Sequence, residues 1–303
     1  PPPPHGPMHM RVGHLKPWLY AAPMLLAVAA VYFYPMVQLV RYSVESVSPS
    51  PYIPSRFVGL DNFRFVWSDT TFRGAIGNNV KLFLAVPILV ALSVLISAIL
   101  FDRKRGWRFY RTMIFLPYVL SIPVVGVVFG YVFQDNGIVN STLRNVGLGG
   151  VAQDWLGTPQ WALWTIMAVI VWKELGFGVI LCLARLMSVD EHLFEAARVD
   201  GARWWRVLWH VTLPQLGPAI AFYAVVELIT MLSWVFAYVY VMTSGGPENS
   251  TVVSEYYIYQ AVFQNNVIGV GAAAGVMLLA VVSVFIVVRL WVAMRFEVSG
   301  YES

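Results

Sequence analysis

The chain has 303 residues, of which 58% are hydrophobic and only 12% are charged, and its formal net charge is +4. A soluble domain carries about twice that fraction of charged residues, so the composition excludes an ordinary solvated globular protein. A single cysteine, Cys182, excludes a disulfide framework and makes a cysteine-based metal site improbable.

The chain begins with a proline-rich stretch, and we expect residues 1–14 to form a disordered tail. The first apolar run follows. It is longer than the apolar core of a cleavable signal peptide and lacks a convincing small-residue cleavage site. We therefore interpret it as a retained membrane span.

Apolar runs of roughly 20 residues predict membrane-spanning helices. Six such runs occur, at about residues 18–40, 78–101, 110–133, 161–184, 218–242 and 268–293. They lack the alternation of barrel strands, and a helix satisfies its own backbone groups in hydrocarbon. The sequence therefore predicts an all-α integral membrane protein, with a six-helix domain over residues 15–295 and a C-terminal tail over residues 296–303.

Basic residues indicate the orientation of these spans, because cytoplasmic loops carry an excess of Lys and Arg. The densest basic cluster, DRKRGWR, lies in the short break between the second and third spans. Four Arg residues between positions 41 and 77 run against the trend, in a longer segment that also contains acids. The bias favours both termini in the cytoplasm, which places the segment between the fourth and fifth spans there as well.

That segment, Glu195 to Pro214, predicts an amphipathic helix over about residues 190–210. Glu195 and Arg198 are three residues apart and can pair on its surface. Gly201 costs about 1 kcal/mol in a helix relative to alanine, which we interpret as room for close approach by a partner. Pro214 disfavours helix at the preceding residue, so we expect a bend before the fifth span. One apolar face is predicted, consisting of Phe194, Ala197, Gly201, Trp204, Trp205 and Leu208. Periodicity alone is equally compatible with a helix lying on the membrane surface.

The segment resembles the EAA loop of bacterial ABC importer permeases: Glu-Ala-Ala, three residues, Gly, nine residues, an aliphatic residue, any residue, then Leu-Pro. Every position is met, by Glu195, Ala196, Ala197, Gly201, Val211, Leu213 and Pro214. Other stretches are similar to the carbohydrate-type subfamily, which includes maltose-like, oligosaccharide and glycerol-phosphate-type permeases. They are FLP at 115–117, WKELGFGVILCLARL at 172–186, VDGA at 199–202 and TSGGPENST at 243–251.

The resemblance implies a type I ABC importer permease in the bacterial cytoplasmic (inner) membrane, carrying a sugar or sugar-like solute by alternating access. It implies a heterodimer with a second homologous permease, two ATPase subunits and an extracytoplasmic substrate-binding protein. In that family the EAA helix is a coupling helix seated in a groove of an ATPase subunit. ATPase coupling is thereby assigned to Glu195, Ala196, Ala197, Arg198, Asp200, Gly201, Trp204, Leu213 and Pro214.

Enzymatic chemistry within this chain is not expected. The phosphate-binding loop G-x-x-x-x-G-K-[ST] is missing, and the dipeptide Gly-Lys never occurs. ATP and Mg are therefore assigned to partner subunits and no cofactor to this chain. His5, His9 and His14 lie in the expected tail, and His192 and His210 are eighteen residues apart, so we predict no metal site, and no nucleic-acid partner is expected.

Candidate solute contacts come from polar groups inside spans, where an ionisable side chain costs about 2.5–3.5 kcal/mol. Lys173, next to Glu174, can pair locally or face a cavity. Asn78 and Asn79 are cavity candidates or an ordinary helix start. A further stripe of polar and aromatic residues suits a sugar, or alternatively subunit packing; it consists of Tyr223, Glu227, Thr230, Trp234 and Tyr238.

Gly245, Gly246 and Pro247 predict a turn after the fifth span, which contacts the binding protein or is a plain surface turn. Gly271 and Gly275 have the spacing of a close helix contact. An ATP-independent carrier and a membrane scaffold are the alternatives to an importer permease. The sequence does not identify the solute.

Overall fold

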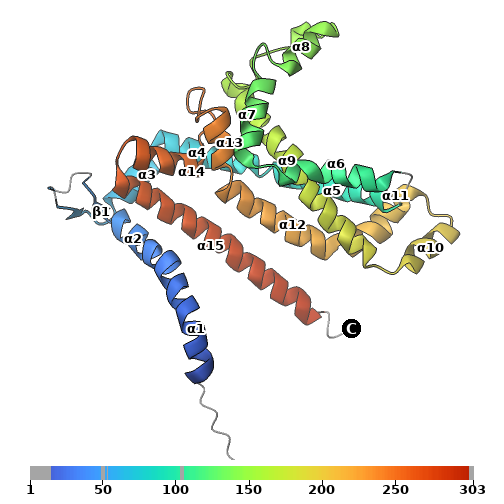
Figure 1. Ribbon diagram of the computed structural model, residues 1–303, viewed down its shortest axis with the longest axis horizontal. Coiled ribbons are helices and arrows are strands. Elements are labelled where there is room, and N and C mark those ends of the chain that lie inside the picture. Colours follow the sequence, from blue (N-terminus) through green and yellow to red (C-terminus); the bar gives the residue numbers. More distant parts are fainter. Residues whose placement is uncertain (1–14, 49–51, 53, 103–105, 300–303) are drawn as a thin grey trace, which may run out of the picture.

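Figure 1 shows the chain in a computed structural model, which describes residues 15–48, 52, 54–102 and 106–299. The α-helices are α1 (Leu15–Val28), α2 (Tyr34–Ser43), α3 (Asp61–Ser68), α4 (Thr70–Leu82), α5 (Ala85–Phe101), α6 (Trp107–Val119), α7 (Ile122–Val132), α8 (Ile138–Asn145), α9 (Pro159–Met187), α10 (Glu191–Val199), α11 (Trp204–Val207), α12 (Leu213–Ser233), α13 (Phe236–Met242), α14 (Ser254–Tyr259) and α15 (Ile268–Ser299). The π-helical turns are η1 (Ala29–Phe33), η3 (Leu208–Thr212) and η4 (Gln260–Gln264), and η2 (Gly149–Val151) is a 3-10 turn. A short antiparallel ribbon pairs β1 (Glu45–Ser46) with β2 (Arg56–Phe57).

Five helices among the described residues are long and apolar enough to cross a membrane: Tyr20–Ser43, Thr70–Phe101, Pro159–Met187, Trp204–Ser233 and Ile268–Val287. They confirm the all-α membrane fold. The last helix continues to Ser299, so residues 296–299 of the tail expected at residues 296–303 are helical. The tail expected at residues 1–14, and residues 300–303, lie outside the described residues.

The predicted third span is not one straight helix. α6 and α7 meet at a bend of 99°, where Leu120 and Ser121 are extended. Pro123 gives the reason, because it has no N–H to donate to the carbonyl of Val119, as a continuous helix would require. Counted as one span, this bent pair brings the number of candidate spans among the described residues to six.

The buried centre of the molecule lies where α5, α9 and α12 pack together. Leu89, Ile166 and Tyr223 are fully buried there. At Gly178 an added Cβ would collide with the Ser93 hydroxyl and the Tyr223 ring. Only glycine therefore allows α9 to approach both neighbours.

The first span stands apart from this centre. α2 packs against α15, where Gly275 of α15 faces Leu39. Gly271 makes a similarly close approach to Val262, so both predicted close contacts occur. α1 diverges from the body in Figure 1, and Tyr20 on it is 86% exposed.

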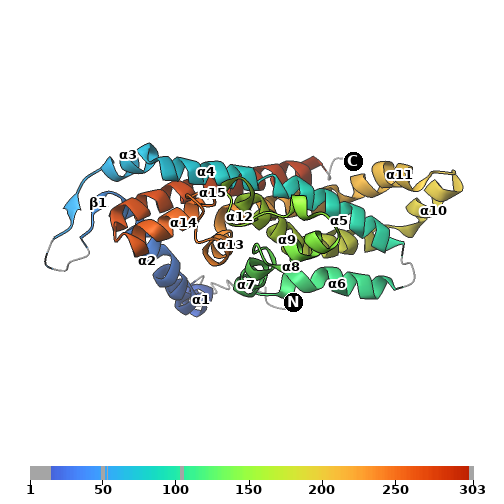
Figure 2. The same cartoon turned by 90° about the horizontal axis from the view of Figure 1, so that it is seen from above.

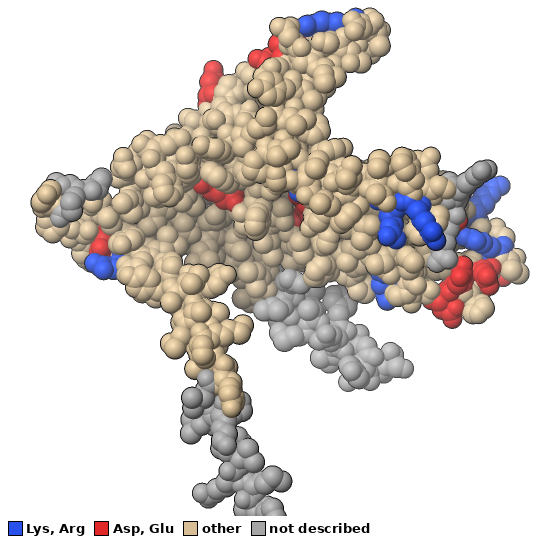
Figure 3. All heavy atoms as spheres, in the orientation of Figure 1, with Lys and Arg blue, Asp and Glu red and all other residues tan. Residues whose placement is uncertain are grey.

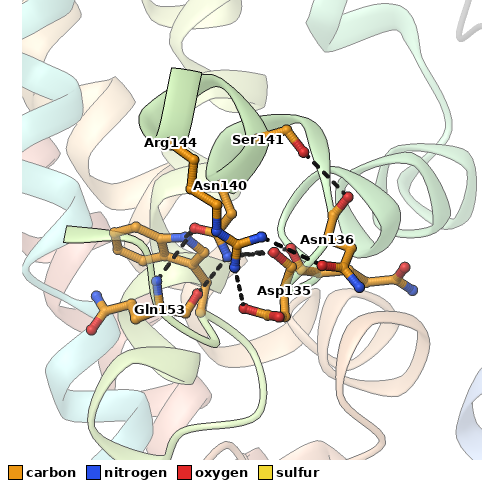
Figure 4. A network of polar contacts seen from close by, with 8 residues as sticks. Asp135, Asn136, Asn140, Ser141, Arg144 and Gln153 are labelled. Atoms are coloured by element: carbon orange, nitrogen blue, oxygen red, sulfur yellow. Dashed lines mark hydrogen bonds and ion pairs between the residues drawn. The ribbon is translucent and has the colours of Figure 1, made fainter. Parts of the chain in front are cut away.

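Between α7 and α9 the chain forms a projection around α8 (Figure 1). Figure 4 shows its polar network. The fully buried side chain of Asn140 donates from Nδ2 to the carbonyls of Asp135 (3.0 Å) and Gln153 (2.8 Å), and its Oδ1 accepts from Trp155 Nε1 (2.8 Å). Arg144 also pairs with Asp135 at 3.0 Å. The amide of Asn140 thus ties both ends of the projection together.

The two ends of the molecule differ in charge. Figures 1 and 2 both place the β1–β2 ribbon and α10 at opposite ends. In Figure 3 most of the visible Lys and Arg side chains gather over α10, α11 and the start of α6, with a patch of Asp and Glu next to them. The molecule therefore has a basic end that carries α10.

Candidate functional site

The helix that carries the Glu-Ala-Ala sequence is shorter than predicted. α10 begins at Glu191, where the Asp190 side chain accepts from the N–H of His192 at 3.0 Å. It ends at Val199, and Asp200 is its C-cap, because Gly201 adopts a left-handed conformation with φ of 73°. The prediction of one helix over residues 190–210 was wrong.

Gly201 serves the backbone of this helix end. Its N–H donates to the carbonyl of Arg198, and the N–H of Ala202 donates to that of Ala197, both at 3.0 Å. These two bonds form the Schellman motif, which favours glycine at the left-handed position. A Cβ added at Gly201 would meet nothing within 4 Å in this chain. The backbone conformation therefore accounts for this glycine without invoking a partner.

The single apolar face predicted for this segment is divided by the break at Gly201. Phe194 is buried on α10, and Leu208 is buried beyond the break. Trp205 is 60% exposed, and Trp204 is partly buried with its ring 4.6 Å from that of Trp205. The segment is an anchored helix followed by a separate one.

Two contacts join α10 to the end of α5. The Phe194 ring lies 4.9 Å from the Phe101 ring, and Arg198 Nη2 lies 3.0 Å from Asp102 Oδ1. Glu195 instead contacts His192 at 3.3 Å, so the predicted Glu195–Arg198 pair does not form. The sequence analysis did not identify Phe101 or Asp102 as contacts of this helix. The sequence offered one signal for them, an acidic residue directly before the three basic residues at 103–105.

The rest of α10 is open. Glu195, Ala196, Arg198 and Asp200 are exposed, and Ala197 is partly exposed. The helix thus presents a polar outer surface, and Phe194 is the side chain of α10 that is buried against the body. A partner docked on the outer surface would act on α5 through Phe194.

The fifth span starts earlier than predicted. Helix runs from Trp204 to Ser233 through the π-helical turn η3, and the expected bend before Pro214 is missing. Leu213 and Pro214 directly follow this turn at the start of α12, and the N–H of Leu213 donates to the Leu208 carbonyl. α11 and the fifth span therefore form one continuous rod.

A buried polar cluster lies between α9, α12 and α13. Lys173 Nζ is 3.2 Å from Glu174 Oε1 and donates to the carbonyl of Tyr118 at 3.3 Å. Tyr238 donates to Glu174 Oε1 at 3.4 Å, and Tyr223 donates to the Glu174 carbonyl at 3.1 Å. The local Lys173–Glu174 pair is confirmed, and the two tyrosines hold it in place.

Glu227 belongs to the same cluster. Its side chain is 1% exposed, it interacts electrostatically with Glu174 and Lys173, and its Oε2 has no hydrogen-bond partner among the described residues. A buried polar atom without a partner costs about 1–3 kcal/mol. This carboxyl group is therefore available to a donor from a solute or from another subunit.

The predicted stripe on the fifth span is only partly realised. α12 ends at Ser233, Trp234 departs from helical geometry, and α13 begins at Phe236. Trp234 is 64% exposed, whereas the Thr230 hydroxyl donates to the Val226 carbonyl at 3.0 Å. The cluster thus unites Lys173, Tyr223, Glu227 and Tyr238, and leaves Thr230 and Trp234 out.

Asn78 and Asn79 hold the loop between α13 and α14. Asn78 Nδ2 donates to the carbonyls of Ser250 (2.8 Å) and Val252 (2.9 Å). Asn79 Nδ2 donates to the Met231 carbonyl (3.0 Å), and its Oδ1 accepts from both Ser254 N and Ser254 Oγ at 2.9 Å. Both amides thus have structural roles in this conformation.

The turn at Gly245, Gly246 and Pro247 lies within that held loop. Gly245 has a φ of 82°, and a Cβ there would collide with the Tyr256 ring. The Tyr256 hydroxyl donates to the Ser244 carbonyl at 2.8 Å, and the Thr251 hydroxyl donates to the Gly246 carbonyl at 2.8 Å. These contacts fix the turn, in which Gly245 is buried and Gly246 and Pro247 are partly exposed.

Comparison with known proteins gives consistent results. A family model described as "Binding-protein-dependent transport system inner membrane component" matches residues 71–298. The lactose transport system permease protein LacF of Rhizobium radiobacter is 34% identical over 251 residues, covering 82% of this chain and 83% of that protein. The sn-glycerol-3-phosphate transport system permease protein UgpA of Escherichia coli is 30% identical over 277 residues, covering 90% and 92%.

A solved structure is also similar. It is a bacterial ABC transporter involved in the import of the acidic polysaccharide alginate, with a TM-score of 0.78 and 27% sequence identity. The likeness covers 93% of this chain and 97% of that one.

Proposed function

The chain belongs to the family of binding-protein-dependent transport system inner membrane components, and from this premise we propose its place in the transport cycle. It is the permease of an ABC importer that passes a sugar or sugar-like solute from an extracytoplasmic binding protein into the cytoplasm. The similarity to LacF and UgpA supports this class of solute. ATP and Mg are bound and ATP is hydrolysed by two partner subunits, and a second homologous permease completes the pathway.

The basic end of the molecule faces the cytoplasm. Lys and Arg concentrate around α10, α11 and the start of α6 (Figure 3), and cytoplasmic loops of membrane proteins carry such an excess. Both termini then lie inside, and the β1–β2 ribbon lies outside.

The coupling contact is made by the outer surface of α10. Glu195, Ala196 and Asp200 are exposed there, and the helix seats in a groove of an ATPase subunit. Movement of the ATPase then reaches α5 through Phe194 and Phe101, whose rings are 4.9 Å apart. This aromatic contact is the observation that carries the mechanism, since Phe194 is the buried residue of α10 and packs against a spanning helix.

The solute pathway passes the buried polar cluster. The unpartnered carboxyl oxygen of Glu227 accepts a hydroxyl donor. The rings of Tyr223 on α12 and Tyr238 on α13 belong to the same cluster. In alternating access, this cluster is covered in the present conformation and uncovered in another. A solute shifts that equilibrium only by its differential affinity for the two states.

An ATP-independent carrier is the second candidate, because Lys173, Glu174 and Glu227 are ionisable groups inside spans, which such carriers use as proton or ion relays. One experiment separates the two. The chain is co-expressed with candidate ATPase, permease and binding-protein subunits, and the purified complex is reconstituted in vesicles with lactose, glycerol 3-phosphate and oligosaccharides as solutes. We expect solute uptake that requires ATP and the binding protein; uptake without ATP would reject the proposal.

A further inference from the structure

A second polar site shares no residue with the buried cluster. A pocket of about 530 Å³ opens between α4, the start of α9 and the loop after α13. Its walls include Gly74, Gly77, Lys81, Gln160, Trp164 and Ser250. The volume falls in the range of about 300–1,000 Å³ that is usual for small-molecule sites.

Helix spacing creates this hollow. Gly74, Gly77 and Lys81 recur at three- and four-residue steps, so they share one face of α4. A Cβ added at either glycine would meet nothing within 4 Å. The missing side chains therefore leave the backbone of α4 as one wall of the pocket, whose lining also includes Lys81 and Trp164, which is 39% exposed.

The charge of Lys81 is uncompensated. Its Nζ donates to Asn78 Oδ1 at 3.2 Å, and none of the residues that line the pocket is acidic. Within the described chain Lys81 forms no ion pair, although other exposed cations such as Arg41 and Arg64 do. Glu248 is close in sequence to the loop residues but does not line the pocket.

A second polar group in the pocket also lacks a partner. The Ser250 hydroxyl oxygen is buried and has no hydrogen bond within the described chain. Its position is fixed, because Asn78 Nδ2 donates to the Ser250 carbonyl at 2.8 Å. The lining of the pocket thus includes a cation without an ion-pair partner, a covered hydroxyl without a hydrogen bond, an aromatic side chain and the amide of Gln160.

The pocket lies at the opposite side of the membrane from α10. Lys81 precedes Phe101 by 20 residues, which is about 30 Å along a helix and matches the thickness of the hydrocarbon core. Since Phe101 contacts α10, Lys81 lies near the other interface. In the proposed orientation this is the outer side, where a solute arrives.

We propose that this pocket is an outer subsite for a sugar-like solute that bears an anionic group, namely a carboxylate, phosphate or sulfonate. Lys81 binds the anion, Trp164 stacks on the ring, and Gln160 and Ser250 bond hydroxyls. Stacking on an aromatic ring and a cation placed for an anion are the chemistry that such a solute requires. The inference rests on the proposed function and adds selectivity to it.

A phospholipid headgroup presents the same anionic chemistry, so the test must separate the two sources. The assembled transporter is placed in phosphatidylcholine nanodiscs without ATP, and its affinities for glucuronate and glucose are measured by calorimetry. These sugars differ at one carbon, where glucuronate has a carboxylate. We expect glucuronate to bind more tightly, and Lys81→Gln to weaken glucuronate about tenfold with no change for glucose.

Two variants control for folding and for general charge. Lys81→Arg keeps the charge and should retain the preference for glucuronate. Arg73→Gln removes a charge from the same helix at an exposed position outside the pocket and should change neither affinity. Equal effects of Lys81→Gln and Arg73→Gln would overturn the subsite, as would equal or undetectable binding of both sugars to the unmodified transporter.

Native mass spectrometry distinguishes a phospholipid bound in the pocket from a bound solute. A phospholipid that is retained by the transporter, lost in Lys81→Gln and not displaced by glucuronate would overturn the solute assignment. Failure of the proposed function is recognised separately, as uptake that does not require ATP, because the binding comparison is made without ATP.

Discussion

The contact between Phe194 and Phe101 should carry most of the coupling between α10 and the spans. Phe194 is 3% exposed and lies in a cluster with Val94, Ala98 and Leu208. Truncating such a buried phenylalanine to alanine costs about 3–5 kcal/mol. At about 1.4 kcal/mol per factor of ten, the packed arrangement of α10 should lose two orders of magnitude or more in population.

The neighbouring ion pair should matter much less. The side chains of Arg198 and Asp102 are 61% and 22% exposed, and pairs of this kind contribute about 0.2–1 kcal/mol. Phe194→Ala should therefore abolish solute-stimulated ATP hydrolysis by the reconstituted complex, whereas Asp102→Asn should keep at least half of it. Phe109→Ala is the matched control, because Phe109 is 62% exposed on α6. Full coupling in Phe194→Ala, or its loss in Asp102→Asn alone, would refute this reasoning.

Three further predictions concern the helix end, the held loop and pH. Gly201→Asn should preserve copurification with the ATPase subunits and Gly201→Val should not, because asparagine tolerates the left-handed conformation; equal loss in both would instead favour close approach of a partner. Asn79→Ala should lower the melting temperature of the purified complex by several degrees, since it leaves buried groups of Met231 and Ser254 unpaired, and an unchanged melting curve would contradict this role. Burial raises the pKa of Glu255, whose carboxylate accepts from Phe236 N–H at 3.0 Å, to about 8. The folded state then holds a proton that the unfolded state releases near its usual pKa of about 4.3, so stability should fall as pH rises from about 5 to 8. Glu255→Gln should flatten that dependence in thermal scans, and an unaltered slope would speak against it.

The spans could be predicted because their length and apolar character are set by the bilayer, whatever the packing. The bend between α6 and α7 was missed although Pro123 marks it, because apolar runs were counted without regard to backbone breaks. The end of α10 was missed for a similar reason. Gly201 sits in an apolar periodicity that continues past it, and the periodicity gave no sign that φ becomes positive there.

Long-range contacts could not be read from the sequence. The pair formed by Asp102 and Arg198 joins residues 96 positions apart, and Asn79 reaches Ser254 across 175 positions. Residue type indicated that Asn78 and Asn79 are unusual in an apolar region, but only the fold shows which carbonyls they bind. Trp234 was placed on the Glu227 stripe because helical spacing was assumed through a point where the helix breaks.

Photocrosslinking from α10 tests the central claim most directly. A photoreactive amino acid replaces Ala196, which is exposed on the outer surface of α10, and in a second variant replaces Ile138, which is 70% exposed on the α8 projection. In the assembled complex, the account predicts a crosslink from position 196 to an ATPase subunit and none from position 138. A crosslink to the ATPase from position 138, with position 196 reacting only with lipid, would contradict it.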